Sequence, residues 1–169
     1  MKNKKQEFIY NELWILTVMG GFQRANIYKK GIYLSEEKRR EFRKLLQEKI
    51  HTITITDYKV TVTTNKHIEN INTIISISSN KTFSKFLNNG KISFGVAQKL
   101  LNLYLKYFWC NGEKIFPPHF PVDRIIQERL NKMTTVLNKR NKKKLYKRRE
   151  IISWTQMESK DIYGNNKFC

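Results

Sequence analysis

The sequence predicts a mainly helical fold, in which residues 1–169 form one compact domain. A length of 169 residues is typical of a single domain, and hydrophobic residues make up 40% of the chain, which is enough to build a core. Apolar residues recur at helical spacing along most of the chain, and asparagine, glycine and proline separate the periodic segments. The sequence contains no internal repeat and no recognisable domain boundary.

The segment from 93 to 110 predicts the longest helix. One apolar stripe consists of Val96, Leu100, Leu103, Tyr104 and Tyr107, and it is widened by Leu101, Leu105, Phe108 and Trp109. A helix that is apolar around most of its girth belongs at the centre of a core. The helical spacing of its aromatic residues favours core packing over the alternative role, a surface on which an extruded base stacks. Asn111-Gly112 then ends the helix.

A second helix is predicted from 36 to 50. Ser35 can cap it, and Glu36 and Glu37 occupy the first turn, where the helix dipole favours negative charge. Its buried stripe consists of Phe42, Leu45, Leu46 and Ile50. We expect this helix and a later one at 124 to 134 to pack on the central helix.

Residues 52–63 allow two interpretations. The alternation of Ile53 and Ile55 and then of Val60 and Val62 predicts a small antiparallel β-hairpin. However, Ile53 also continues the helical period of the preceding segment.

Two further segments are apolar. Residues 66–78 have helical spacing, although their β-branched residues weaken the prediction of a helix. Residues 13–19 predict a buried element, since they are too few for the roughly 20 apolar residues of a membrane helix.

The charge of the chain predicts its class of partner. Lys and Arg number 33 against 14 acidic residues, which gives a net charge of +19. Such an excess favours a polyanion, so we expect a nucleic acid, DNA rather than RNA, and no membrane partner. Cys110 and Cys169 are too few for a disulfide framework or a cysteine-based zinc site, which favours the cytoplasm.

The segment 139–149 is the strongest electrostatic candidate for nucleic-acid binding. It contains eight basic residues and no acidic one: Lys139, Arg140, Lys142, Lys143, Lys144, Lys147, Arg148 and Arg149. Self-repulsion predicts that the segment is mobile or weakly helical until an anion binds. The alternative is a solvated charged linker.

Residues 90–130 carry a pattern that suggests chemistry: Gly95, Lys99 and Asn102, followed by Val122 and Asp123. This pattern resembles the catalytic segment of helix-hairpin-helix DNA glycosylases. The resemblance implies that the Lys99 amine attacks the sugar carbon of a damaged nucleotide to form a Schiff base, assisted by Asp123. It also implies altered phosphate binding, because Ala97 stands where the family has its second hairpin glycine. The alternatives are an exposed helix residue for Lys99 and a helix cap for Asp123.

A larger part of the chain resembles a family of bacterial proteins without an assigned function, through Gly20-Gly21, Ala25-Asn26-Ile27-Tyr28 and Pro118-His119-Phe120-Pro121. His119 is a further candidate site residue because prolines hold it rigidly, with a structural hydrogen bond as the alternative. His51, His67 and His119 lie far apart without a carboxylate cluster, so we expect no metal.

Common enzyme signatures are absent from the sequence. It has no glycine-rich nucleotide loop, no Gly-x-Ser-x-Gly elbow and no acidic cluster for two metals, and we expect no cofactor. The sequence therefore predicts a basic, cytoplasmic nucleic-acid-binding protein. The most specific form of this prediction is a base-excision enzyme that acts through Lys99 and Asp123. The alternative is a non-catalytic interaction protein of a bacterial defence or mobile-element system, with a protein partner.

Overall fold

The computed structural model describes residues 3–23, 25–118, 124–142, 146–148, 150–152, 156 and 158. In this part of the chain the elements are α1 (Lys4–Phe22), α2 (Glu36–Asp57), α3 (Thr64–Ser78), the 3-10 helix η1 (Asn88–Gly90), α4 (Phe94–Cys110) and α5 (Arg124–Arg140). The described residues form no β-strand, apart from one isolated antiparallel bridge between Tyr28 and Leu87. The prediction of a mainly helical fold is confirmed.

Side-chain caps fix where the helices of the body begin. The residue before each helix accepts a hydrogen bond from a backbone amide of the first turn: Asn3 from Lys5, Ser35 from Lys38, Thr63 from Lys66 and Ser93 from Val96. These short polar side chains satisfy amides that have no partner within the helix. Ser35 therefore acts as the sequence predicts.

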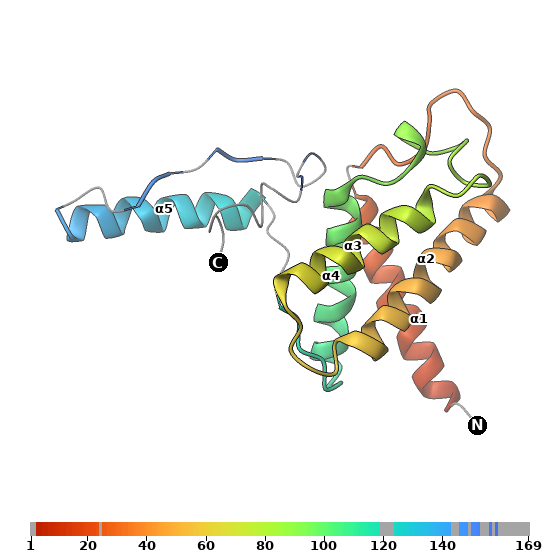
Figure 1. The fold of residues 1–169 in the computed structure, drawn as a ribbon, viewed down its shortest axis with the longest axis horizontal. Helices are drawn as coiled ribbons and strands as arrows, with labels where there is room; N and C mark the ends of the chain where they lie inside the picture. Colours follow the sequence, from red (N-terminus) through yellow and green to blue (C-terminus); the bar gives the residue numbers. More distant parts are fainter. Residues whose placement is uncertain are drawn as a thin grey trace.

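Helix α4 is the centre of the four-helix body (Figure 1), and α1, α2 and α3 all contact it. Eleven of its residues are buried, among them Leu100, Leu101 and Leu105, which have no exposed surface. Removal of so much apolar surface from water is the main force that holds the body together. The predicted central role of this helix is confirmed.

Helix α1 approaches α4 closely at two glycines. A Cβ atom built on Gly20 would lie 2.8 Å from Leu103 Cδ1, and one built on Gly21 would overlap the side chain of Leu100. The absence of a side chain at both positions lets the helix backbones approach until Leu100 fills the space between them.

The predicted hairpin at 52–63 does not form, and the alternative, continuation of the helix, is what the structure has. Helix α2 extends to Asp57, so Ile53 and Thr54 join the buried face that begins with Phe42. The Thr52 and Thr56 hydroxyls donate to the carbonyls of Glu48 and Thr52 at 2.8 and 3.0 Å. These intrahelical bonds and the burial of Ile53 outweigh the preference of β-branched residues for strands.

One packing expectation was wrong, and a second is confirmed only in part. Helix α5 extends away from the four-helix body (Figure 1) instead of covering α4, and α1 takes that place. Residues 13–19 form part of α1, where Trp14 and Thr17 are buried but Ile15, Leu16 and Met19 are exposed. The apolar run is therefore a helix that is buried on one side only.

Candidate functional site

The residues of the glycosylase-like pattern differ in burial, and the structure describes only some of them. Lys99 is half-buried on α4, within its first turns. Gly95 and Ala97 are also residues of α4, and both are buried. Asp123 and His119 lie outside the described residues.

The basic segment begins in the last turn of α5, which contains Lys139 and Arg140. The described cations that follow are Lys142, Lys147 and Arg148, and all five of these side chains are exposed. Lys143, Lys144 and Arg149 lie outside the described residues. Exposed cations on and beside one helix form a surface that a phosphate backbone can reach.

Two amide side chains on α5 hold the chain that follows it. Gln127 donates to the carbonyl of Ile152 and accepts from its amide, both at 2.9 Å. Asn138 makes the same pair of bonds to Tyr146, at 2.7 and 3.0 Å. A carboxamide carries one donor group and one acceptor, so it can bind a peptide unit in this two-point manner. The described parts of 146–152 therefore lie along α5.

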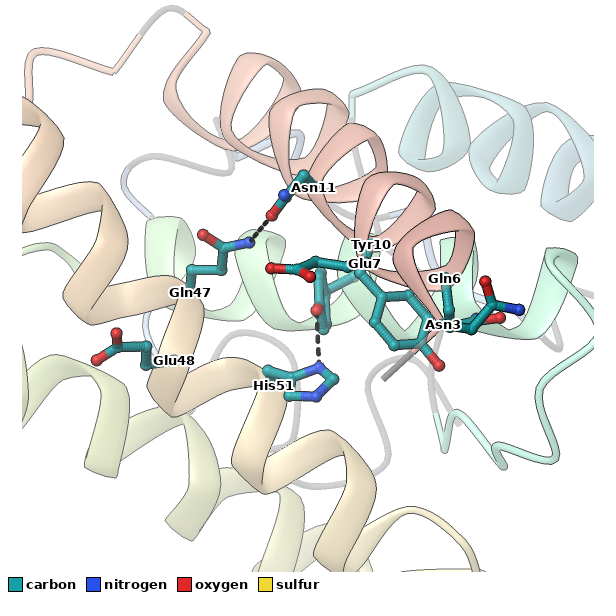
Figure 2. Close-up of a pocket in the computed structure, with 9 residues that line it drawn as sticks. Asn3, Gln6, Glu7, Tyr10, Asn11, Gln47, Glu48 and His51 are labelled. Carbon is teal, nitrogen blue, oxygen red and sulfur yellow. Dashed lines mark hydrogen bonds between the residues drawn. The ribbon is translucent and has the colours of Figure 1, made fainter. Parts of the chain in front are cut away.

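A polar pocket of about 560 Å³ lies between α1, α2 and the middle of α4. Figure 2 shows side chains of α1 and α2 facing one another across it, with Gln47 donating to Asn11 at 3.1 Å. The lining residues are Asn3, Gln6, Glu7, Tyr10, Asn11, Gln47, Glu48, His51 and Tyr104. This lining contains two carboxylates and an imidazole but no lysine or arginine.

Hydrogen bonds set the orientation of the groups at the floor of the pocket. His51 Nδ1 lies 3.0 Å from the Tyr104 hydroxyl, and burial raises the pKa of Tyr104. The Tyr10 hydroxyl donates to Glu113 at 3.0 Å, and burial together with this carboxylate raises the pKa of Tyr10. Both tyrosines are thus held in their neutral forms, in which they can serve as hydrogen-bond donors.

The composition of the pocket decides which ligands it can accept. Glu7 and Glu48 line it from α1 and α2, so a phosphate would meet carboxylates without a compensating cation in the lining. A small polar molecule with hydrogen-bond donors fits better. No pattern in the sequence indicates this pocket, because its residues come from segments far apart in the chain.

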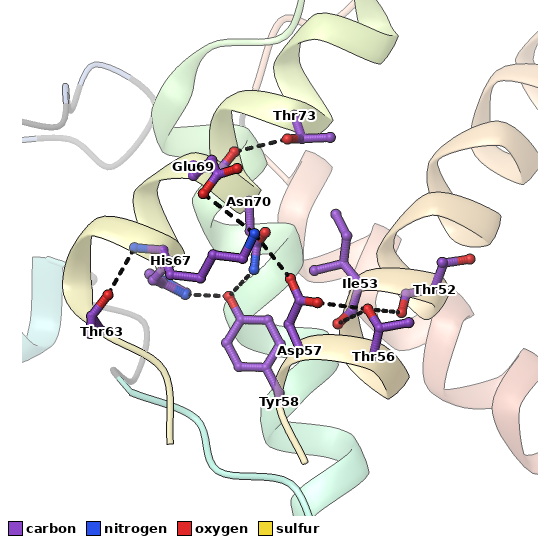
Figure 3. A network of polar contacts seen from close by, with 11 residues as sticks. Thr52, Ile53, Thr56, Asp57, Tyr58, Thr63, His67, Glu69, Asn70 and Thr73 are labelled. Carbon is purple, nitrogen blue, oxygen red and sulfur yellow. Dashed lines mark hydrogen bonds and ion pairs between the residues drawn. The ribbon is translucent and has the colours of Figure 1, made fainter. Parts of the chain in front are cut away.

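A second polar cluster is enclosed between the end of α2 and α3 (Figure 3). The Tyr58 hydroxyl lies 2.7 Å from His67 Nδ1 and accepts a hydrogen bond from Asn70 at 3.3 Å. Tyr58 and His67 are fully buried, so this cluster supports the structure and is not open to a ligand. In the part of the chain that the structure describes, no group of three or more His, Cys, Asp or Glu side chains could hold a metal ion.

Trp109 departs from the expectation that the aromatic residues of α4 belong to the core. Tyr104 and Phe108 are buried as predicted, but 61% of Trp109 is exposed. Trp109 lies in the last turn of α4, between the buried Phe108 and the exposed Cys110. Helical spacing alone could not show that the core leaves Trp109 uncovered in a turn where Phe108 is buried.

Comparisons with known proteins gave no match. No family model matches the chain, and no curated protein or solved structure matches it either. Among the helices that the structure describes, none combines the length and the apolar character needed to cross a bilayer. The function must therefore be argued from the chemistry of the surface.

Proposed function

We propose that the chain is a cytoplasmic DNA-binding protein whose main phosphate contacts are made by α5 and the residues after it. The observation that carries this proposal is the charge of that segment. Between 124 and 152 the described residues include two acidic side chains, Glu128 and Glu150, and eight basic side chains that are all exposed: Arg124, Arg129, Lys132, Lys139, Arg140, Lys142, Lys147 and Arg148.

The position of α5 supports a contact with a long polyanion. The helix extends from the four-helix body (Figure 1), and its 17 residues correspond to a length of about 25 Å. Glu128 is paired with Arg124 at 2.8 Å, so these two opposite charges offset each other and the remaining cations carry the net positive charge.

The experiment that tests this proposal is a salt titration of duplex DNA binding. A variant with five glutamines in the segment (Lys139, Arg140, Lys142, Lys147 and Arg148 replaced) is compared with a control that removes the same charge from other exposed positions (Lys29, Lys30, Lys81, Lys85 and Lys91). The slope of log affinity against log salt should become shallower by up to about 4.5 in the first variant, because each phosphate contact releases counterions.

Two outcomes would contradict the proposal. Equal losses in both variants would mean that net charge alone causes binding, without a defined contact surface. Binding of the wild-type chain that does not change with salt would mean that phosphates are not the main contact.

Base excision is the finer version of the proposal, and it is supported by the Gly95, Lys99 and Asp123 pattern and by the partial burial of Lys99 on α4. Borohydride should then trap a covalent adduct on oligonucleotides with damaged bases or abasic sites. Lys99→Gln should abolish the adduct, and Lys91→Gln, at an exposed lysine shortly before the same helix, should not. Equal trapping by both variants would show that lysines react indiscriminately, and it would refute the proposal of base excision.

Binding of a protein partner is the second candidate, and it is favoured by an apolar stripe on α5. Leu130, Met133 and Leu137 recur at helical spacing and are exposed by 41, 59 and 36%. Self-association measured by light scattering is the first test of this stripe. Association that persists in high salt and is lost in Met133→Gln would favour this candidate.

A further inference from the structure

An apolar groove with a lysine at its edge lies where α4 ends. It has a volume of about 690 Å³, and its lining residues are Thr61, Lys106, Trp109, Ile115, Phe116, Pro117 and Pro118. Trp109 and Phe116 are 61 and 52% exposed, although both are large aromatic side chains. We refer to these seven residues as the Trp109 groove.

The backbone holds the two aromatic residues in place. After α4 the chain turns back toward the α2–α3 connection (Figure 1), and the Phe116 amide donates to the Tyr58 carbonyl at 2.9 Å. Ile115 is 5% exposed and anchors this segment in the core. Trp109 belongs to a helix and Phe116 to an anchored segment, so an aromatic surface is available without rearrangement.

The charge around the Trp109 groove is positive. Lys106 lines it. Lys59 directly follows Tyr58 in the chain, and Lys114 directly precedes Ile115. All three lysines are exposed. Two nearby carboxylates are engaged elsewhere. Asp57 lies 3.7 Å from Lys66, and Glu113 accepts hydrogen bonds from Gln6 and Tyr10.

We propose that the Trp109 groove binds an unpaired base of single-stranded DNA, which stacks on Trp109 and Phe116 while lysines contact the adjoining phosphates. An aromatic surface beside exposed cations suits a ligand that has flat apolar faces and negative charge. In a duplex the faces of the bases are covered by their neighbours, so this site selects single strands. The inference rests on the proposed DNA binding, but it assigns a different surface and a different form of DNA.

The test compares the affinities of the full chain for oligothymidine and for a duplex of equal length, with Trp109→Ala, Trp109→Phe and Tyr33→Ala as variants. Trp109→Ala should weaken single-strand binding by about 5- to 150-fold, the loss expected for one base stacked on an aromatic ring. Trp109→Phe should restore part of the affinity, and duplex affinity should change little. Tyr33 is 91% exposed in a loop and provides the matched control.

Several results would overturn the inference. These are single-strand binding that survives Trp109→Ala, equal losses on single strands and duplex, and loss in the Tyr33→Ala control. Preference for oligouridine over oligothymidine would overturn the assignment to DNA. Because most of the Trp109 side chain is exposed, its truncation should leave the helical circular dichroism unchanged.

The same measurements separate this inference from the proposed function. A wild-type chain that binds duplex but not oligothymidine would refute the Trp109 groove and leave DNA binding through α5 intact. A wild-type chain that binds neither would refute both.

Discussion

The Tyr58 hydroxyl lies 2.7 Å from His67 Nδ1, and neither side chain has exposed surface. This hydrogen bond joins the end of α2 to α3 inside the core. Asn70, one turn further along α3, donates to the same hydroxyl at 3.3 Å. The hydroxyl thereby partners Nδ1 of His67 and the amide nitrogen of Asn70, two side chains that have been removed from water, so its loss costs more than an average hydrogen bond.

Tyr58→Phe should lower the free energy of unfolding by about 1 to 3 kcal/mol, because the ring is kept while His67 and Asn70 lose a shared partner. Urea denaturation measures this change as a lower midpoint. Tyr33→Phe, at a position that is 91% exposed, should change the stability by less than about 0.5 kcal/mol. An unchanged midpoint in Tyr58→Phe would contradict the role of the cluster.

Tyr104 should make the stability depend on alkaline pH. Burial raises the pKa of Tyr104 in the folded chain, whereas in the unfolded chain it is about 10. The folded state therefore retains this proton longer. The stability that results is fully present below about pH 10 and decreases above it, by up to about 1.4 kcal/mol per pH unit.

The check on Tyr104 is urea denaturation of the wild-type chain and Tyr104→Phe from about pH 8 to about pH 11, a range that spans the unfolded tyrosine pKa. The wild-type chain should lose stability more steeply than the variant. Lysine titration affects both proteins equally, so the difference between them reports Tyr104. Parallel pH profiles would show that Tyr104 does not contribute.

Gly21→Ala should destabilise the body, although alanine favours a helix over glycine by about 1 kcal/mol. The added methyl would overlap the buried Leu100 side chain, and overpacking of this kind costs about 1 to 3 kcal/mol. Gly20→Ala is the matched control, because its methyl meets the terminal Cδ1 atom of Leu103. Thermal denaturation should show the larger loss for Gly21→Ala, and the reverse order would contradict the proposed close contact.

Gln127→Ala should release the chain near Ile152 from α5. Hydrogen exchange of the Ile152 amide should become faster by about 5- to 30-fold, the equivalent of one to two net hydrogen bonds. Asn138→Ala should have the corresponding effect on the Tyr146 amide and little effect on Ile152. Equal exchange rates in wild type and Gln127→Ala would show that the bonds to Ile152 give no protection in solution.

The sequence was sufficient to predict the helical fold and its central helix. The apolar residues of α4 predicted its approximate bounds, 93 to 110, and its wide apolar face, because periodicity is a local property. The choice between helix and hairpin at Ile53 depends on burial of this side chain against other helices. The local alternation of apolar residues contains no information about that burial. The position of α5 was not predictable for the same reason, since its stripe indicates that a partner is needed but not which one.

The candidate sites were less accessible to sequence reasoning. The pocket around His51 is lined by Glu7 and Glu48, which lie on helices whose residues are far apart in the chain. The sequence spacing of these residues does not show that they line the same pocket. Trp109 shares the period of the core residues and follows the buried Phe108, yet it is a surface residue, which periodicity alone does not show. Lys99 was named from a pattern, and its role stays a prediction.

The contact between α1 and α4 also has a consequence for how the chain acquires its structure during synthesis. These helices are the first and fourth of the body, and most of the body lies between them in sequence. Helix α1 leaves the ribosome long before α4, so the apolar face around Trp14 has no partner surface until residues near Cys110 have been synthesised. The nascent chain is therefore most prone to aggregation, and most in need of a chaperone, before α4 has emerged.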